Sequence, residues 1–303
     1  RHAVSIGALG IETIAEQMMP GFPDLSDEFY ATWHAWVEQY GFVPTAHDMF
    51  AETKLYRDRD RPTDELVDDL TRDIDHTRKL GAGIIRILAT TPPEVVDLAA
   101  GYAGENGVRL LTEIHSPLRL ESPWFDSHMA NAEKWGPGVV GFMPDLGIFV
   151  RRFPRIIAER ALRDGADPGI VQRAVATYDD GGDVAALLEQ VASGTPSPAE
   201  LRIAMAAGQY TNEDPRALLA FMPYIGHIQA KFYEMVDDRH EFSIPYDEII
   251  AVLKEGGYAG YLSSEYEGNR HIQDAFPVDS REQLRRHHAM MSGLLGEGQD
   301  SDV

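Results

Sequence analysis

Short apolar segments alternate with longer amphipathic segments along most of the chain, and this alternation is the feature that most limits its fold. The short segments have the length and apolar content of strands, and the longer ones have the periodicity of helices. Strands that alternate with helices in this way form parallel βα units, so an α/β fold is expected. Strands are predicted at residues 3–10, 42–48, 82–88, 108–115, 139–147, 225–233 and 258–266.

The segments between these strands carry signals for the start and end of a helix. Residues 62–81 read PTDELVDDLTRDIDHTRKLG, with proline and acidic residues first and lysine followed by glycine last. Proline and negative charge are preferred where a helix begins, and glycine is preferred just beyond its end. The repeated order of strand, helix, glycine and strand favours a TIM (β/α)8-type barrel over an open sheet. Closure needs an eighth strand, expected before Arg1 or in a segment that the pattern does not reveal.

Residues 151–220 interrupt this order, because they show helical periodicity but no convincing strand. The run is too long for a single connection between a helix and a strand. We interpret it as a helical insertion on a single barrel domain that spans residues 1–303. A separate small helical domain is the alternative, but no Gly/Ser/Pro-rich linker flanks the run on both sides.

The composition excludes several classes of partner and site. A formal net charge of −22 repels phosphate backbones and anionic lipid, so neither nucleic acid nor a membrane is an expected partner. No apolar run reaches the roughly 18 to 20 residues of a membrane span, and the first ten residues do not resemble a signal peptide, so a cytoplasmic protein is expected. The absence of cysteine leaves only oxygen and nitrogen as metal ligands.

Polar side chains gather where four successive predicted strands end, and active sites of barrels lie at these carboxyl ends. The residues are Glu113, His115, Asp145, His227, Gln229, Lys231 and Glu265. A single acid at such a place most often caps a helix or forms an ion pair. Several buried carboxylates without a cation would be costly, however, and a divalent metal removes that cost.

The predicted metal ligands are Glu113, Asp145, Glu265 and one residue of HIQAK at 227–231. Alternate residues of a strand share a face, so all three polar residues of HIQAK point the same way. Gln229 lies in the middle and is favoured over His227. This oxygen-rich set suits Mn²⁺ or Mg²⁺, with another divalent cation as an alternative.

Four motifs in order, TEIH at 112–115, PDLG at 144–147, GHIQAK at 226–231 and SSEYEG at 263–268, resemble those of the xylose isomerase-like barrels, the sugar phosphate isomerases/epimerases. The resemblance covers roughly residues 3–290 and implies one metal held by Glu, Asp, His and Glu on successive strands. Two departures put the epimerase mechanism in doubt. Ile148 replaces a substrate-contacting histidine found in many members, and Gln229 replaces the second histidine of their H-x-H-x-K motif.

Within this family, EIH, the amide in GHIQAKFYEM and the long insertion look most like the larger (alpha) subunit of bacterial C-glycoside deglycosidases. That resemblance implies a metal-dependent lyase that cleaves the C–C bond of 3-oxo-C-glycosides by proton abstraction and β-elimination. It also implies a small β-rich second subunit and a higher oligomer. On this interpretation His115 is the general acid/base, Lys231 stabilises oxyanion charge and His227 orients the substrate.

Other functions remain as alternatives at this point. A metal-dependent ketose isomerase/epimerase would use Glu113 and Glu265 as bases on opposite faces of the sugar, and a keto-cyclitol dehydratase is closely related. A DNA-repair endonuclease of this fold needs about three metals, more histidine ligands and a basic groove, which the sequence lacks. A sugar-binding protein without activity is not expected to keep a metal site, a histidine and a lysine in one pocket.

Overall fold

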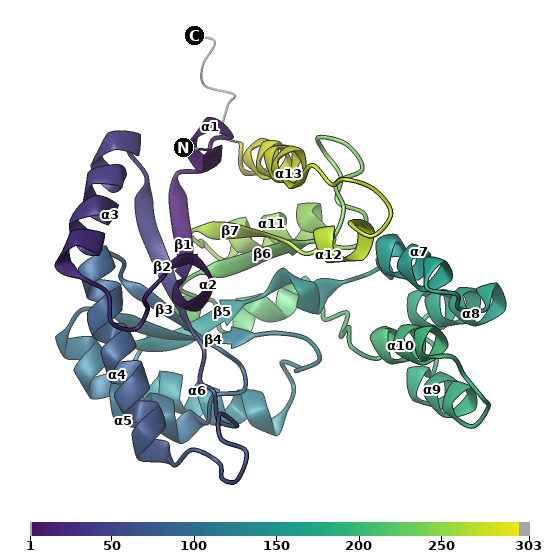
Figure 1. The fold of residues 1–303 in the computed structure, drawn as a ribbon, viewed down its shortest axis with the longest axis horizontal. Coiled ribbons are helices and arrows are strands. Elements are labelled where there is room, and N and C mark those ends of the chain that lie inside the picture. Colours follow the sequence, from purple (N-terminus) through teal and green to yellow (C-terminus); the bar gives the residue numbers. More distant parts are fainter. Residues whose placement is uncertain (1, 297–303) are drawn as a thin grey trace.

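The computed structural model describes residues 2–296 and arranges parallel strands inside a layer of helices (Figure 1). β1 to β5 form one sheet in chain order, and β6 and β7 form a second. Single bridges from Phe142 to Ile225 and from Asp145 to Gln229 join β5 to β6. The strands are β1 (Gly10–Ile14), β2 (Val43–Met49), β3 (Ile84–Ile87), β4 (Arg109–Ile114), β5 (Val140–Pro144), β6 (Ile228–Phe232) and β7 (Leu262–Tyr266). Within the described residues, β7 and β1 share no ladder.

Six of the seven predicted strands are confirmed within a few residues of the predicted bounds, but the first prediction is wrong. Residues 3–10 were expected to form a strand, whereas helix α1 spans His2–Ser5 and the strand is Gly10–Ile14. The apolar content of AVSIGALG favoured the wrong segment, because the true strand, GIETI, contains a glutamate. Ile11 packs beside α3 while Glu12 makes its contacts inside the barrel, so the acid is compatible with a strand.

Helices cover the outside of the strands in the order expected of βα units. The main ones are α3 (Asp27–Tyr40), α4 (Thr63–Leu80), α5 (Pro93–Glu105), α6 (Pro123–Trp135), α11 (Tyr246–Glu255) and α13 (Ser280–Leu295). α4 confirms the predicted signals, because Asp64 and Glu65 occupy its first turn and Gly81 ends it with a φ of 81°. The short elements are α2 (Ala15–Met18), α12 (Asn269–Ile272), η1 (Leu146–Phe149), η2 (Pro215–Ala220) and η3 (Met222–Tyr224).

The segment predicted to be a helical insertion contains four helices that pack on one another at one side of the barrel (Figure 1). They are α7 (Arg155–Arg163), α8 (Pro168–Asp179), α9 (Val184–Ala192) and α10 (Pro198–Ala207). The chain after α10 is tied to the barrel, because the Thr211 hydroxyl donates to the carbonyl of Ile148 at 2.9 Å and lies 3.2 Å from the Ser116 hydroxyl. A single domain over residues 1–303 stays a prediction.

The junction between β5 and β6 depends on close backbone packing. A Cβ added to Gly141 would stand 2.2 Å from the carbonyl oxygen of Tyr224 and 3.2 Å from Leu111. Any larger residue there would push apart the segments that carry Asp145 and Gln229, because real Cβ atoms do not come so close to a backbone oxygen. Among the described helices, none combines the length and apolar character that a membrane span requires.

His128 makes the packing of α6 on β4 sensitive to pH. Its ring is buried, with Nδ1 3.3 Å from the Thr112 hydroxyl and the ring centroid 4.8 Å from that of Trp124. Burial lowers the pKa of His128 to about 4. In the unfolded chain the pKa returns to about 6.5, so the unfolded state binds the proton first as the pH falls. The stability contributed by neutral His128 is therefore complete above about pH 6.5 and is lost as the pH falls from about 6.5 to about 4.

We predict that His128→Leu makes the free energy of unfolding less dependent on pH. Between about pH 7 and pH 5 the wild type should lose about 2 kcal/mol more than the variant, because only the wild type must bury a neutral imidazole. Denaturant unfolding at both pH values measures this difference. The variant also loses the Thr112 hydrogen bond, but this loss lowers its unfolding free energy equally at both pH values and so cancels in the comparison. Parallel pH dependence in the two proteins would contradict the assignment.

Candidate active site

Polar side chains from all seven strands or the residues just beyond them meet inside the barrel, and we call this set the interior ring. Alternation along each strand turns these side chains away from the helices. The interior ring consists of Glu12 on β1, Asp48 on β2, Arg86 on β3, Glu113 on β4, Asp145 after β5, Gln229 and Lys231 on β6 and Glu265 on β7. The sequence predicted five of its members as site residues.

Arg86 holds one side of the interior ring together. Its guanidinium lies 2.9 Å from Oδ2 of Asp48 and 3.1 Å from Oε1 of Glu113, and all three side chains are buried. Burial raises the pKa of Glu113 although Arg86 opposes the shift, and burial with the neighbouring charge of Glu12 raises the pKa of Asp48 well above its usual value. A cation therefore already accompanies the predicted ligand Glu113.

Lys231 joins the other side of the interior ring. Its Nζ lies 2.5 Å from Oδ2 of Asp145, 2.9 Å from Nε2 of His115 and 3.6 Å from Oε2 of Glu265. Burial opposes the charge on Lys231, but Asp145 and Glu265 outweigh it and raise its pKa. Burial also raises the pKa of Glu265 to about 8, with Lys231 acting against the shift. Lys231 is thus a buried ammonium held between two acids.

The contacts of His115 define its tautomer. Nδ1 lies 2.5 Å from the carbonyl oxygen of Ser116, which can only accept, so Nδ1 carries the hydrogen. Nε2 faces the ammonium of Lys231, which can only donate, so Nε2 carries no hydrogen and accepts this hydrogen bond at 2.9 Å. The same nitrogen is 3.6 Å from Asp145. The nitrogen of His115 that faces the interior ring is therefore a proton acceptor. Asp145 is close enough to stabilise a protonated His115.

Glu12 is the member of the interior ring that lies outside every predicted strand, and the sequence did not predict it as a site residue. Its Oε1 accepts from Nε2 of Gln229 at 2.5 Å, and its Oε2 lies 3.2 Å from Nε2 of His227. Burial works against ionisation of Glu12, but His227 and the other polar neighbours together outweigh it and lower the pKa to about 2. The missed signal was the glutamate of GIETI, between Ile11 and Thr13.

His227 lies apart from the predicted metal ligands other than Gln229. Its Nε2 is 2.7 Å from the hydroxyl of Ser263 in addition to its contact with Glu12, and its side chain is fully buried. Its described contacts are therefore with β1 and β7, and none of them reaches Asp145 or Glu265. Its predicted role in orienting the substrate stays a prediction.

The predicted metal ligands come from neighbouring strands, since Asp145 pairs with Gln229 across β5 and β6 and Glu265 pairs with Lys231 across β6 and β7. Within residues 2–296, however, no group of three or more His, Asp or Glu side chains is arranged to hold a metal ion. The ammonium of Lys231 lies between Asp145 and Glu265 instead. The expectation that these acids need a metal is corrected in one respect, because Arg86 and Lys231 already balance part of their charge.

The donor chemistry of the interior ring nevertheless fits a divalent cation. Five carboxylates face only two permanent cations, which leaves an excess of three negative charges when all are ionised. Oδ2 of Asp145 and Oε2 of Glu265 are buried without a hydrogen bond and have only their ion pairs with Lys231. Carboxylate and amide oxygens are the ligands that Mg²⁺ and Mn²⁺ prefer. The ligand set stays a prediction.

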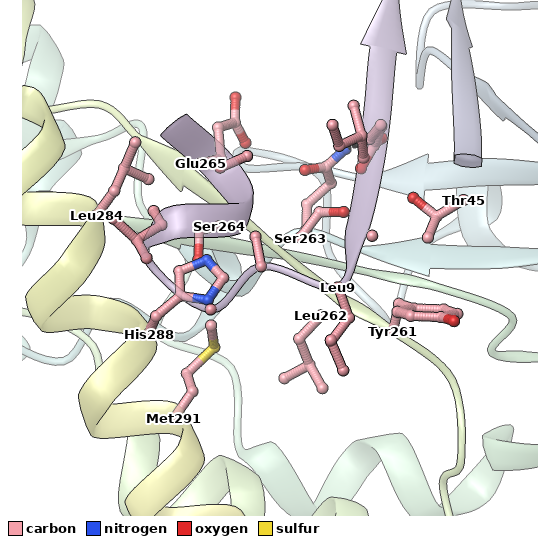
Figure 2. Close-up of a pocket in the computed structure, with 18 of the residues that line it drawn as sticks. Leu9, Thr45, Tyr261, Leu262, Ser263, Ser264, Glu265, Leu284, His288 and Met291 are labelled. Atoms are coloured by element: carbon pink, nitrogen blue, oxygen red, sulfur yellow. Dashed lines mark hydrogen bonds between the residues drawn. The ribbon is translucent and has the colours of Figure 1, made fainter. Parts of the chain in front are cut away.

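A cavity of about 1000 Å³ opens between β1 and β7 (Figure 2). Its polar end is formed by five members of the interior ring, namely Glu12, Asp48, Arg86, Gln229 and Glu265. Leu284, His288 and Met291 of α13 border the cavity on one side, and Leu9, Tyr261 and Leu262 line it near β1 and β7 (Figure 2). His115, Asp145 and Lys231 do not line it, so the cavity meets only part of the interior ring.

Comparison with known proteins found no matching family model. Among curated proteins, the chain is 26% identical over 307 residues to the 3'-dehydrocarminate deglycosidase alpha subunit of a Microbacterium species, covering 95% of this chain and 86% of that protein. It is 28% identical over 300 residues to a C-glycoside deglycosidase alpha subunit of Arthrobacter globiformis, covering 92% and 81%.

Solved structures resemble the whole barrel. An L-ribulose 3-epimerase superposes with a TM-score of 0.56 at 14% identity and covers 97% of this chain and 86% of its own. A xylose isomerase-like TIM barrel protein from Mycobacterium smegmatis, in complex with magnesium, superposes with a TM-score of 0.51 at 17% identity and covers 97% and 87%.

These comparisons confirm the predicted fold class and the predicted resemblance. They also confirm the prediction of an enzyme, because the curated relatives are deglycosidase subunits and the similar structures include sugar epimerases. The chain therefore has the fold of the xylose isomerase-like TIM barrels, and its curated relatives are alpha subunits of C-glycoside deglycosidases.

Proposed function

We propose that this chain is the barrel subunit of a divalent-metal-dependent lyase that cleaves the C–C bond of 3-oxo-C-glycosides. The observation that carries the proposal is the orientation of His115, whose unprotonated Nε2 lies beside Lys231 and Asp145 at the end of β4. A base fixed beside an ammonium and several buried acids suits proton removal next to a carbonyl group. The names of the curated relatives support the substrate class.

The proposed metal is Mn²⁺ or Mg²⁺, or another divalent cation, held by Glu113, Asp145, Gln229 and Glu265. When bound, it supplies Lewis-acid chemistry that polarises the 3-oxo group and an adjacent hydroxyl of the sugar. The magnesium in the related Mycobacterium smegmatis barrel supports a divalent cation in this fold. Lys231 is the proposed donor to developing oxyanion charge, because its buried ammonium faces the same acids.

The proposed reaction is a β-elimination and needs no oxidant. The C2–H bond of the 3-oxo sugar breaks, a C1=C2 double bond forms, and the bond between C1 and the aglycone breaks. The aglycone carbon gains one proton, so atoms and electrons balance. We assign both proton transfers to His115. Its Nε2 accepts the proton from C2, and the resulting imidazolium, 3.6 Å from Asp145, donates a proton to the aglycone carbon. His227 is proposed to orient the substrate.

A sugar isomerase/epimerase or a keto-cyclitol dehydratase is the second candidate. The observation in its favour is that desolvation raises the pKa of both Glu113 and Glu265, which suits carboxyls that exchange protons. The epimerases among the similar structures support the fold for this chemistry but not the substrate.

A second subunit is part of the proposal. The curated relatives are named alpha subunits, which supports a partner chain for this one. We propose a small β-rich subunit and a higher oligomer. Sugar or glycoside binding then belongs to the complex, and activity tests should include the partner.

The reaction itself can be tested by offering the chain, with Mn²⁺ and the candidate partner subunit, a 3-oxo-C-glucoside and a free ketose in parallel. We expect release of the aglycone, measured by chromatography, and loss of that release with EDTA followed by recovery with Mn²⁺. Interconversion of the ketose without aglycone release would contradict the lyase and support the second candidate.

For His115, we predict that His115→Gln lowers kcat by about 10²- to 10⁴-fold, the usual contribution of a general acid/base. The change should not unfold the protein, because the His115 side chain is 44% exposed. His240→Gln is the matched control, since that histidine lies on the surface and its ring contacts Asp237, away from the interior ring. A variant with unchanged metal content and nearly full kcat would remove His115 from the mechanism.

A further inference from the structure

We propose that Glu12 is a positioning residue that turns the side-chain amide of Gln229 so that its oxygen is available to the metal. The inference rests on the proposed function, because it concerns Gln229 as a metal ligand. The resemblance implies a histidine at this position. Glu12 lies on β1, whereas the four motifs of the resemblance lie on β4 to β7 and the turn after β5. No role for it follows from those motifs.

The hydrogen bond between the two side chains fixes which end of the amide faces Glu12. The distance from Nε2 of Gln229 to Oε1 of Glu12 is 2.5 Å. An ionised carboxylate only accepts hydrogen bonds, and of the two polar atoms of an amide only the nitrogen donates. The nitrogen is therefore committed to Glu12. Within residues 2–296, Oε1 of Gln229 receives no hydrogen bond and is left for another partner.

Glu12 is itself held in place by further contacts. Its Oε2 lies 3.2 Å from Nε2 of His227, and that nitrogen is also 2.7 Å from the hydroxyl of Ser263. His227 therefore connects Glu12 to β7, which carries Ser263. Only 9% of its side chain is exposed. With both oxygens engaged by protein groups, Glu12 acts through Gln229 and is not itself a ligand.

An amide ligand needs such a partner more than a carboxylate does. A carboxylate offers two equivalent oxygens, so it binds a cation in either orientation, whereas an amide turned by 180° presents hydrogens to the cation. Partners that orient a metal ligand are typically worth about 10- to 100-fold in metal affinity. Glu12 thus makes it possible for glutamine to serve at a position where related barrels use histidine.

The test measures Mn²⁺ affinity by the electron paramagnetic resonance signal of free Mn²⁺, which does not depend on turnover. We expect Glu12→Gln to raise the Kd for Mn²⁺ by about 10- to 100-fold, because either end of the new amide can face Gln229. Glu105→Gln is the matched control, since it removes the same charge from the exposed end of α5. Thermal unfolding of the metal-free proteins checks that Glu12→Gln still folds.

The same substitution in a Gln229→Ala background separates positioning from a general effect of charge. If Glu12 acts through the amide, Glu12→Gln should change the Kd little once the amide is gone. An unchanged Kd in the single variant, or the same increase in both backgrounds, overturns the role of Glu12 while leaving the metal in place. Absence of Mn²⁺ binding by the wild type, or a wild-type Kd for Gln229→Ala, overturns the proposed ligand set and the inference with it.

Discussion

The ion pair between Lys231 and Asp145 is the interaction on which the rest of the site depends. It spans the junction of β5 and β6, where single bridges replace a continuous ladder, and its atoms are 2.5 Å apart in a buried environment. Removal of either partner would leave an uncompensated buried charge, which typically costs about 3–5 kcal/mol. The same ammonium fixes the lone pair of His115 and faces Glu265. The junction of β5 with β6 and the orientation of His115 therefore depend on one side chain.

Opposite charges divide the interior ring into environments with different proton affinities. Glu12 is stabilised in its ionised form, whereas burial favours the protonated form of Glu265 at neutral pH. Arg86 and Lys231 balance only part of the negative charge, and the remaining excess is what a divalent cation would neutralise. The acids thus form a set of hydrogen-bonded and ion-paired groups, and they differ in how readily each binds a proton.

The sequence predicted the βα order, six strands and most of the interior ring, because strand periodicity and barrel topology place strand-terminal side chains at one end. Glu12 was missed because the eight-residue apolar segment that runs into GIETI, residues 3–10, looked more like a strand than GIETI does. The pairing of Arg86 with Glu113 and of Lys231 with Asp145 was not predictable either. Such contacts depend on the register between strands, which a single sequence does not specify.

A crystal structure grown with Mn²⁺ and analysed by anomalous scattering would show whether the interior ring holds a divalent cation. We expect a manganese peak bound by oxygens of Glu113, Asp145, Gln229 and Glu265, with the ammonium of Lys231 moved away from Asp145. No peak at the interior ring, with Lys231 still paired to Asp145 and Glu265, would contradict the proposed metal site. The acids would then serve as ion-pair partners of Lys231 and Arg86.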